Sequence, residues 1–235
     1  MIEVKVTVTR FDPERDVAPY PQSYNMVVRE NQTILDVLMD LAADHDPSIA
    51  FRRACRSGIC GCCAVSIDGK PKLACETLVS SVLKDGEIRI APLPHFRVLK
   101  DLVVDIDRFL DSLRAVVPWL VLKPEYAGRM AQAEVRRLEK SSECILCGIC
   151  QADGTVDEGD PRSQLNPAAM VKGFRLAFDA RDAIGVERAK LVRDLGLLDR
   201  PLDRDGRLGC PKQIDFAGQI VPDLRRALSE TDQRQ

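Results

Sequence analysis

Three features are scarce in this sequence: long apolar runs, an excess of charge of either sign, and histidine. The longest apolar run lies around Ala115 to Leu122, is broken by Pro118 and is too short to cross a bilayer. We therefore expect a protein that is soluble by itself. The formal net charge of -2 gives no support for nucleic-acid binding. His45 and His95 are the only histidines, and each is better explained as a surface or linker residue than as a metal ligand.

We also expect no secretory signal, because Met1 leads directly into the alternating residues Ile-Glu-Val-Lys-Val. Nine cysteines in such a chain favour metal ligation in a reducing compartment over a disulfide framework. The 235 residues are enough for one large domain or two ordinary ones, and 45% hydrophobic residues can build a sizeable core.

The first group of cysteines predicts a metal-binding loop. Cys55, Cys60 and Cys63 have the C-x4-C-x2-C spacing of a plant-type [2Fe–2S] site, and Cys75 is a distant fourth thiolate. The two glycines between these cysteines let the backbone fold close around inorganic sulfides, and loop N–H groups can then donate to the cluster. Cys62 is spare and is expected to pack beside the cluster as a small apolar side chain. A zinc knuckle or disulfides are the alternative interpretations.

Alternating segments around this loop predict a sheet wrapped around one helix. The predicted strands are residues 2–8, 24–29, 64–67, 72–75 and 87–90. The turn Asp68-Gly69 joins two of them as a hairpin, and Thr33 is a candidate N-cap for the helix that follows it. We predict an α+β protein whose first domain, residues 1–95, is a β-grasp domain like that of plant-type ferredoxins.

The second half of the chain, residues 96–235, is predicted to be an all-α, bacterial-ferredoxin-like domain. Its helices are predicted over residues 102–113, 127–140, 168–181, 188–198 and 221–228. Cys144, Cys147 and Cys150 form a C-x2-C-x2-C run, and Cys210 is the one remaining cysteine that can complete a set of four. We predict a [4Fe–4S] cluster on these four cysteines, with a four-thiolate zinc site as the alternative.

Several segments together resemble the iron–sulfur subunit of the succinate dehydrogenase/fumarate reductase family, which is respiratory complex II. The segments that carry the likeness are Cys55-Arg56-Ser57-Gly58-Ile59-Cys60-Gly61, Asp101-Leu102-Val103-Val104-Asp105, Cys144-Ile145-Leu146-Cys147, Pro167-Ala168-Ala169, Phe174-Arg175, Asp179-Ala180-Arg181-Asp182 and Cys210-Pro211-Lys212. The resemblance covers nearly the whole chain. It implies an electron-transfer subunit of the tricarboxylic acid cycle and respiratory chain, beside an FAD-containing flavoprotein subunit that oxidises succinate or reduces fumarate.

The same resemblance implies a membrane-anchor subunit that binds haem or quinone. The chain would then be cytoplasmic and peripheral on the cytoplasmic face of the inner membrane, held there through its partner subunits. The family normally carries a third cluster, [3Fe–4S], beside the quinone. Its three cysteines would fall at Gly154, Arg200 and Gly206, and the family's quinone-site histidine would fall at Pro201. We therefore expect no [3Fe–4S] cluster and no quinone site of the usual design.

We expect no catalytic residue and no substrate site in this chain, because its role is to hold clusters and tune their potentials. The alternative function is an iron–sulfur adaptor subunit of a different flavoprotein oxidoreductase, with a soluble electron donor or acceptor. A zinc-bound interaction protein that uses the same eight cysteines is a further alternative. A brown colour of the pure protein would exclude it.

Overall fold

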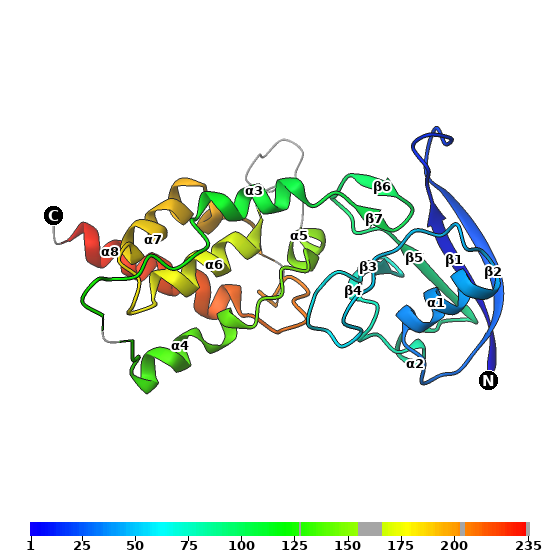
Figure 1. Ribbon diagram of the computed structural model, residues 1–235, viewed down its shortest axis with the longest axis horizontal. Coiled ribbons are helices and arrows are strands. Elements are labelled where there is room, and N and C mark those ends of the chain that lie inside the picture. Colours follow the sequence, from blue (N-terminus) through cyan, green and yellow to red (C-terminus); the bar gives the residue numbers. More distant parts are fainter. Residues whose placement is uncertain (127, 155–165, 203–204, 234–235) are drawn as a thin grey trace. The chain divides into compact units, whose positions relative to one another are not determined.

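A computed structural model describes the chain apart from residues 127, 155–165, 203–204 and 234–235. The chain divides into two compact units, residues 1–106 with 145–153 and residues 107–144 with 154–235 (Figure 1). The first unit carries a mixed sheet, and the second is helical. Among the described residues, every helix is too short or too polar to span a bilayer.

The two units differ from the domains predicted over residues 1–95 and 96–235. The first unit continues through a short two-stranded sheet of β6 (Val98–Lys100) and β7 (Val103–Val104). It also takes in α5 (Ile149–Asp153), because the apolar face of this helix belongs to the core of the sheet unit. The boundaries of the domains themselves stay a prediction.

The sheet of the first unit has five strands in the order β2-β1-β5-β3-β4. These are β1 (Ile2–Arg10), β2 (Tyr20–Val28), β3 (Ala64–Ile67), β4 (Lys70–Leu73) and β5 (Glu87–Ala91). β1 is antiparallel to β2 and parallel to β5, while β3 is antiparallel to both β4 and β5. In β1 the side chains of Val4, Val6 and Val8 all point into the core, since alternate residues of a strand share one face. All five predicted strands are confirmed, with ends shifted by up to four residues.

One face of the sheet is covered by α1 (Ile34–Asp44), as Figure 1 shows. The helix begins where predicted, because Thr33 caps it: the Thr33 hydroxyl accepts from the backbone N–H of Asp36, and the Asp36 carboxylate accepts from the N–H of Thr33. Its buried residues recur at helical spacing and fill the core beneath the helix. A single turn, α2 (Val79–Val82), follows β4.

A buried ion-pair network ties this unit together. The Arg10 guanidinium donates to Asp101 at 3.0 Å and to Asp46 at 2.6 Å, and it also donates to the Tyr24 hydroxyl. Asp101 is 1% exposed and also accepts from the backbone N–H of Ala50. The network joins β1, β2, the end of α1 and the segment before β7.

The helix predicted over residues 102–113 is wrong at its start, because Val103–Val104 is strand β7 and α3 begins only at Asp107 (α3, Asp107–Ala115). Tertiary hydrogen bonds explain the difference. The N–H of Leu102 donates to the carbonyl of Ala50 and that of Asp105 to the carbonyl of Arg97, and Val103–Val104 pairs with β6. These backbone groups are therefore used across strands and cannot form the first turn of a helix.

The second unit consists of helices packed around α6. They are α3, α4 (Gln132–Ser142), α6 (Pro167–Ala177), α7 (Gly185–Asp194), a 3-10 turn (Leu197–Asp199), a π-helical turn (Phe216–Ile220) and α8 (Val221–Asp232). Asn166 caps α6, since its side-chain oxygen accepts from the N–H of Ala168 and its amide donates to the carbonyl of Phe109 on α3. Every helix predicted in this half is present with shifted ends, and residue 127 of the predicted 127–140 helix lies outside the described residues.

A second buried ion pair organises the helical unit. Arg188 on α7 is fully buried and donates to Asp182 at 2.7 Å, and both side chains are 0% exposed. The same guanidinium donates to the backbone carbonyls of Val116, Val117 and Trp119. One arginine thus holds the segment after α3 against α7, although Trp119, Leu120 and Leu122 of this segment are exposed.

Candidate metal centres

The β3–β4 hairpin brings Cys63 and Cys75 together. Ala64 pairs with Leu73 across the two strands, and the N–H of Ala74 donates to the carbonyl of Cys63 at 3.1 Å. The carbonyl of Ala74 in turn accepts from the first turn of α1. These two cysteines therefore flank a regular ladder anchored to the helix, and both are buried, at 4% and 8% exposure.

The loop before β3 is shaped by left-handed residues. Arg56, Gly58 and Gly61 have φ values of 58°, 65° and 72°. A left-handed residue in a turn directs neighbouring backbone N–H groups toward one side of the chain, where they form a concavity that favours negative charge. The side that receives these N–H groups carries the cysteine sulfurs.

Three backbone N–H groups point at the sulfur of Cys55. Those of Ile59 and Cys60 lie 3.3 Å from it, and that of Ser57 lies at 3.5 Å. These donors, together with the Cys60 thiol, lower the pKa of the Cys55 thiol to about 6. Hydrogen bonds to a sulfur stabilise its thiolate form, and the thiolate is the form that binds metals.

The four sulfurs lie as two neighbouring pairs, since the Cys60 thiol acts on the pKa of Cys55 and the Cys75 thiol acts on that of Cys63. The first pair is exposed and the second is buried. A fourth backbone donor, the N–H of Gly58, lies 3.3 Å from the Cys75 sulfur and joins the two pairs through the loop. Four cysteines, with backbone N–H groups directed at the sulfurs of Cys55 and Cys75, are the ligand set expected of a two-iron cluster.

Burial has the opposite effect on the inner cysteines. It raises the pKa of the Cys63 thiol to about 12 and that of Cys62 to about 11. A buried thiolate needs a bound cation, so ligation at Cys63 would be coupled to release of its proton. The sulfur of Cys62 lies 3.3 Å from that of Cys60, which places the spare cysteine at the edge of the loop.

The second set of cysteines is divided between the two units. Cys147 and Cys150 belong to the sheet unit, where Cys150 is 9% exposed on α5, whereas Cys144 and Cys210 belong to the helical unit. In the ranges that the structure describes, no group of three or more His, Cys, Asp or Glu side chains is arranged to hold a metal ion. This holds for the first set of cysteines as well as for the second, so ligation of a cluster at either set stays a prediction.

The two cysteine loops of the sheet unit touch at Gly61. A Cβ at this glycine would lie 2.9 Å from the Cα and Cβ of Cys147 and 2.9 Å from the carbonyl oxygen of Ile145. These distances are shorter than any van der Waals contact allows, so only glycine lets the two loops approach so closely. Sequence reasoning assigned Gly61 to the first cluster alone and missed this second role.

The structure also describes two of the positions where the family's third-cluster cysteines would fall, Arg200 and Gly206. Arg200 is 4% exposed, so a bulky cationic residue is buried where a family cysteine would fall. Gly206 has a φ of 68°, and a Cβ there would lie 2.4 Å from the Cβ of Ala217 in the π-helical turn. A cysteine side chain at Gly206 would displace that turn.

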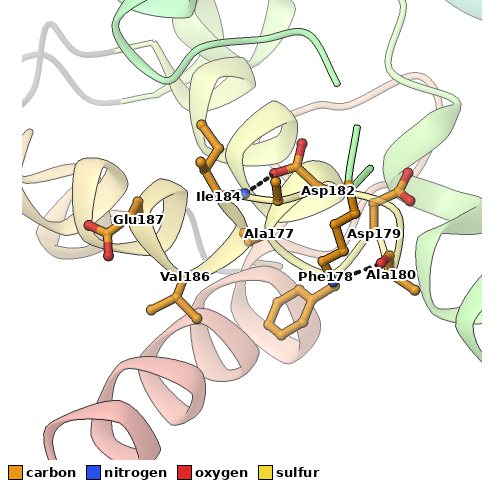
Figure 2. A pocket seen from close by; sticks show the side chains of 11 residues that line it. Ala177, Phe178, Asp179, Ala180, Asp182, Ile184, Val186 and Glu187 are labelled. Carbon is orange, nitrogen blue, oxygen red and sulfur yellow. Dashed lines mark hydrogen bonds between the residues drawn. The ribbon is translucent and has the colours of Figure 1, made fainter. Parts of the chain in front are cut away.

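Figure 2 shows a hollow in the helical unit between the end of α6 and the start of α7. Its two aspartates are already paired. Asp179 accepts from Arg175 and Arg181, and the Arg181 guanidinium holds the pKa of that carboxyl below its usual range. Asp182 is bound to Arg188 and also accepts from the N–H of Ile184. These charges hold the α6–α7 connection in place.

The comparisons with known proteins agree with this geometry. A model of the 2Fe-2S iron–sulfur cluster binding domain matches residues 5–111. An iron–sulfur subunit of mitochondrial succinate dehydrogenase (ubiquinone) from Oryza sativa is 37% identical over 222 residues, covering 91% of this chain and 78% of the relative. A fumarate reductase iron–sulfur subunit from Mycobacterium tuberculosis is 35% identical over 226 residues, covering 94% and 91%.

A solved structure has the same fold. A chain of the Mycobacterium smegmatis Sdh1 complex in its apo form superposes with a TM-score of 0.85 at 24% identity, covering 98% of this chain and 97% of that one. The sheet, the cysteine loop and the matching domain define an iron–sulfur protein of the [2Fe–2S]-binding class. The chain belongs to the family of iron–sulfur subunits of succinate dehydrogenase and fumarate reductase, and it is an electron-transfer subunit of an oxidoreductase complex of this type.

Proposed function

We propose that this subunit relays electrons through two clusters, a [2Fe–2S] and a [4Fe–4S]. The ligands would be Cys55, Cys60, Cys63 and Cys75 for the first and Cys144, Cys147, Cys150 and Cys210 for the second. The observation that carries the proposal is the arrangement of four sulfurs in two pairs on a loop lined with N–H groups. When bound, the clusters supply one-electron transfer.

The chain's own residues would set where and how easily that transfer occurs. The N–H groups around Cys55 stabilise negative charge on its sulfur, and burial of Cys63 and Cys75 keeps water from the inner side of the loop. Hydrogen bonds, charge and solvent exposure are the means by which a protein tunes a cluster. The contact at Gly61 brings the loop that carries Cys147 against the first site and so favours transfer between the two sites.

The domain assignment also belongs to this proposal. A five-stranded mixed sheet with α1 across one face supports a β-grasp, plant-type ferredoxin domain over residues 1–95. Helices packed around α6 support a bacterial-ferredoxin-like domain over residues 96–235.

The subunit would lack the [3Fe–4S] cluster and the usual quinone site. The buried Arg200 and the tight packing at Gly206 support this, because both positions are filled by other structure. Electrons that leave the second cluster would then pass to a haem or cluster on another subunit, to a quinone bound elsewhere, or to a soluble carrier.

The partners would be an FAD-containing flavoprotein subunit, which acts on succinate or fumarate, and a membrane-anchor subunit. The chain would lie on the cytoplasmic face of the inner membrane through these partners. The names of the relatives support the first partner, since both belong to complexes that act on these dicarboxylates. The absence of the three third-cluster cysteines favours one alternative, an adaptor subunit of another flavoprotein oxidoreductase with a soluble electron partner.

The test is low-temperature EPR with iron and zinc determination on anaerobically purified protein, as isolated and after reduction. We expect two reduced-cluster signals, no oxidised [3Fe–4S] signal and about six iron atoms per chain. A [3Fe–4S] signal near full occupancy would overturn the two-cluster proposal, and zinc without iron would favour an interaction protein. Identifying the subunits that co-purify from native membranes separates a membrane-anchored complex from the soluble adaptor.

A further inference from the structure

Glu76 places a carboxylate against the first cysteine loop. It directly follows Cys75, and its backbone N–H is held by the carbonyl of Leu73 at 3.1 Å. Its side chain lies over Gly58 so closely that a Cβ at this glycine would be 1.9 Å from the nearer Glu76 oxygen and 2.3 Å from the carboxyl carbon. The carboxylate thus occupies the space that the missing side chain of Gly58 leaves.

Gly58 connects this carboxylate to the metal site. Its N–H donates to the sulfur of Cys75 at 3.3 Å, so the residue that the carboxylate covers is itself bound to a ligand sulfur. Glu76 is exposed to water, whereas Cys75 is buried. A negative charge therefore lies at the solvent side of the loop. Gly58 is in contact with both this charge and the sulfur of Cys75.

The positive charges of the loop are on its other arm. Arg52 is half-buried, Arg53 and Arg56 are exposed, and the Arg53 guanidinium stacks over the ring of Phe51 at 5.8 Å. These arginines precede or follow Cys55, whereas Glu76 follows Cys75. The two ends of the site thus carry charges of opposite sign.

We propose that the Glu76 carboxylate lowers the reduction potential of the cluster on this loop, an inference that rests on the proposed [2Fe–2S] site. Reduction adds one electron to the cluster, supplied by the flavoprotein partner in the complex or by dithionite in a titration. The added charge is repelled by a fixed negative charge nearby, and net charge is one of the factors that set cluster potentials. Glu76 is a positioning residue in this role, since it binds no iron.

The experiment is an EPR-monitored redox titration of the [2Fe–2S] signal in the full chain, comparing wild type with Glu76→Gln, Glu76→Asp and Glu14→Gln. Glutamine keeps the shape and removes the charge, aspartate keeps the charge, and Glu14 is an exposed carboxylate in the β1–β2 connection. We expect Glu76→Gln to favour reduction by about threefold or more, where tenfold corresponds to about 59 mV for one electron. The Glu76→Asp and Glu14→Gln variants should titrate like wild type.

The difference between wild type and Glu76→Gln should shrink as salt is raised, because an exposed charge is screened. Equal potentials for these two proteins would overturn the inference, and so would a Glu76→Asp shift as large as that of Glu76→Gln. If Glu76→Gln does not load a cluster, Glu76→Thr serves the same comparison. A wild-type protein without any [2Fe–2S] signal would overturn the proposed function as well, which separates the two failures.

Discussion

Two glycines of this chain share a backbone conformation and differ in their surroundings. Gly61 has a φ of 72° and lies against Cys147, whereas Gly69 in the β3–β4 turn has a φ of 78° and nothing within 4 Å of its missing Cβ. An alanine in the left-handed conformation costs about 1–2 kcal/mol at either site. A clash with backbone costs about 1–3 kcal/mol more.

We therefore expect Gly61→Ala to lower the free energy of unfolding clearly more than Gly69→Ala does. The measurement is denaturant unfolding of both variants beside wild type, together with their iron content. Gly61→Ala should also lose iron, because its loop must move. Equal losses of stability in the two variants would mean that the two cysteine loops do not touch at Gly61.

Arg188 connects several parts of the helical unit. It is fully buried with Asp182, and it satisfies three backbone carbonyls of the segment after α3. Removing one partner leaves a buried charge without compensation, at a cost of about 3–5 kcal/mol.

Arg188→Met should therefore destabilise the protein by about that amount, measured by chemical denaturation. Arg193→Met is the matched control on the same helix, since the Arg193–Asp194 pair is 44% and 61% exposed. Exposed pairs contribute about 0–1 kcal/mol. Similar effects of both substitutions would contradict the central role of Arg188.

The contact of α1 with the first two strands depends on the ionised form of Asp46. Its carboxylate accepts from the hydroxyls of Ser48 and Tyr24 and from Arg10, and these donors, with Ser48 the strongest, hold its pKa well below its usual range. A carboxyl whose pKa is lowered by folding stabilises the protein above its unfolded pKa of about 4, and this contribution fades as the pH falls below that value.

The stability advantage of wild type over Asp46→Asn should therefore be largest near neutral pH and should shrink as the pH is lowered below about 4. Unfolding of both proteins at a series of pH values measures it. Asp44→Asn, which alters an exposed carboxylate at the end of the same helix, is the control for the loss of one negative charge. A constant difference for Asp46→Asn would refute the assignment.

The proposed second cluster would join two segments far apart in sequence, the run that carries Cys144, Cys147 and Cys150 and the segment that carries Cys210. Cys147→Ser should remove about four of the roughly six iron atoms expected for the two clusters, and it should lower the stability of the protein, because cluster binding is coupled to folding. Cys62→Ser is the control and should keep both clusters. Iron determination and EPR before and after denaturant titration measure both effects. Full iron content in Cys147→Ser would show that the assignment of the ligands is wrong.

Most of the secondary structure could be predicted from sequence, because it depends on neighbours along the chain. The alternation of valines in β1 and the capping by Thr33 are local patterns, and both are confirmed. The start of α3 could not be predicted in this way. The apolar period continues through Val103 and Val104, but these residues pair with β6, and the N–H of Leu102 donates to the carbonyl of Ala50, which lies far away in sequence.

The candidate site likewise has features that could be predicted from sequence and others that could not. The spacing of Cys55, Cys60 and Cys63 was by itself sufficient to predict a [2Fe–2S] site, because one short loop must carry three ligands. Which sulfurs pair, the approach of Cys147 to Gly61 and the position of Glu76 over Gly58 were decided only by the tertiary structure. These contacts join segments far apart along the chain, and packing of the hairpin, the helix and the two loops determines them rather than any local preference.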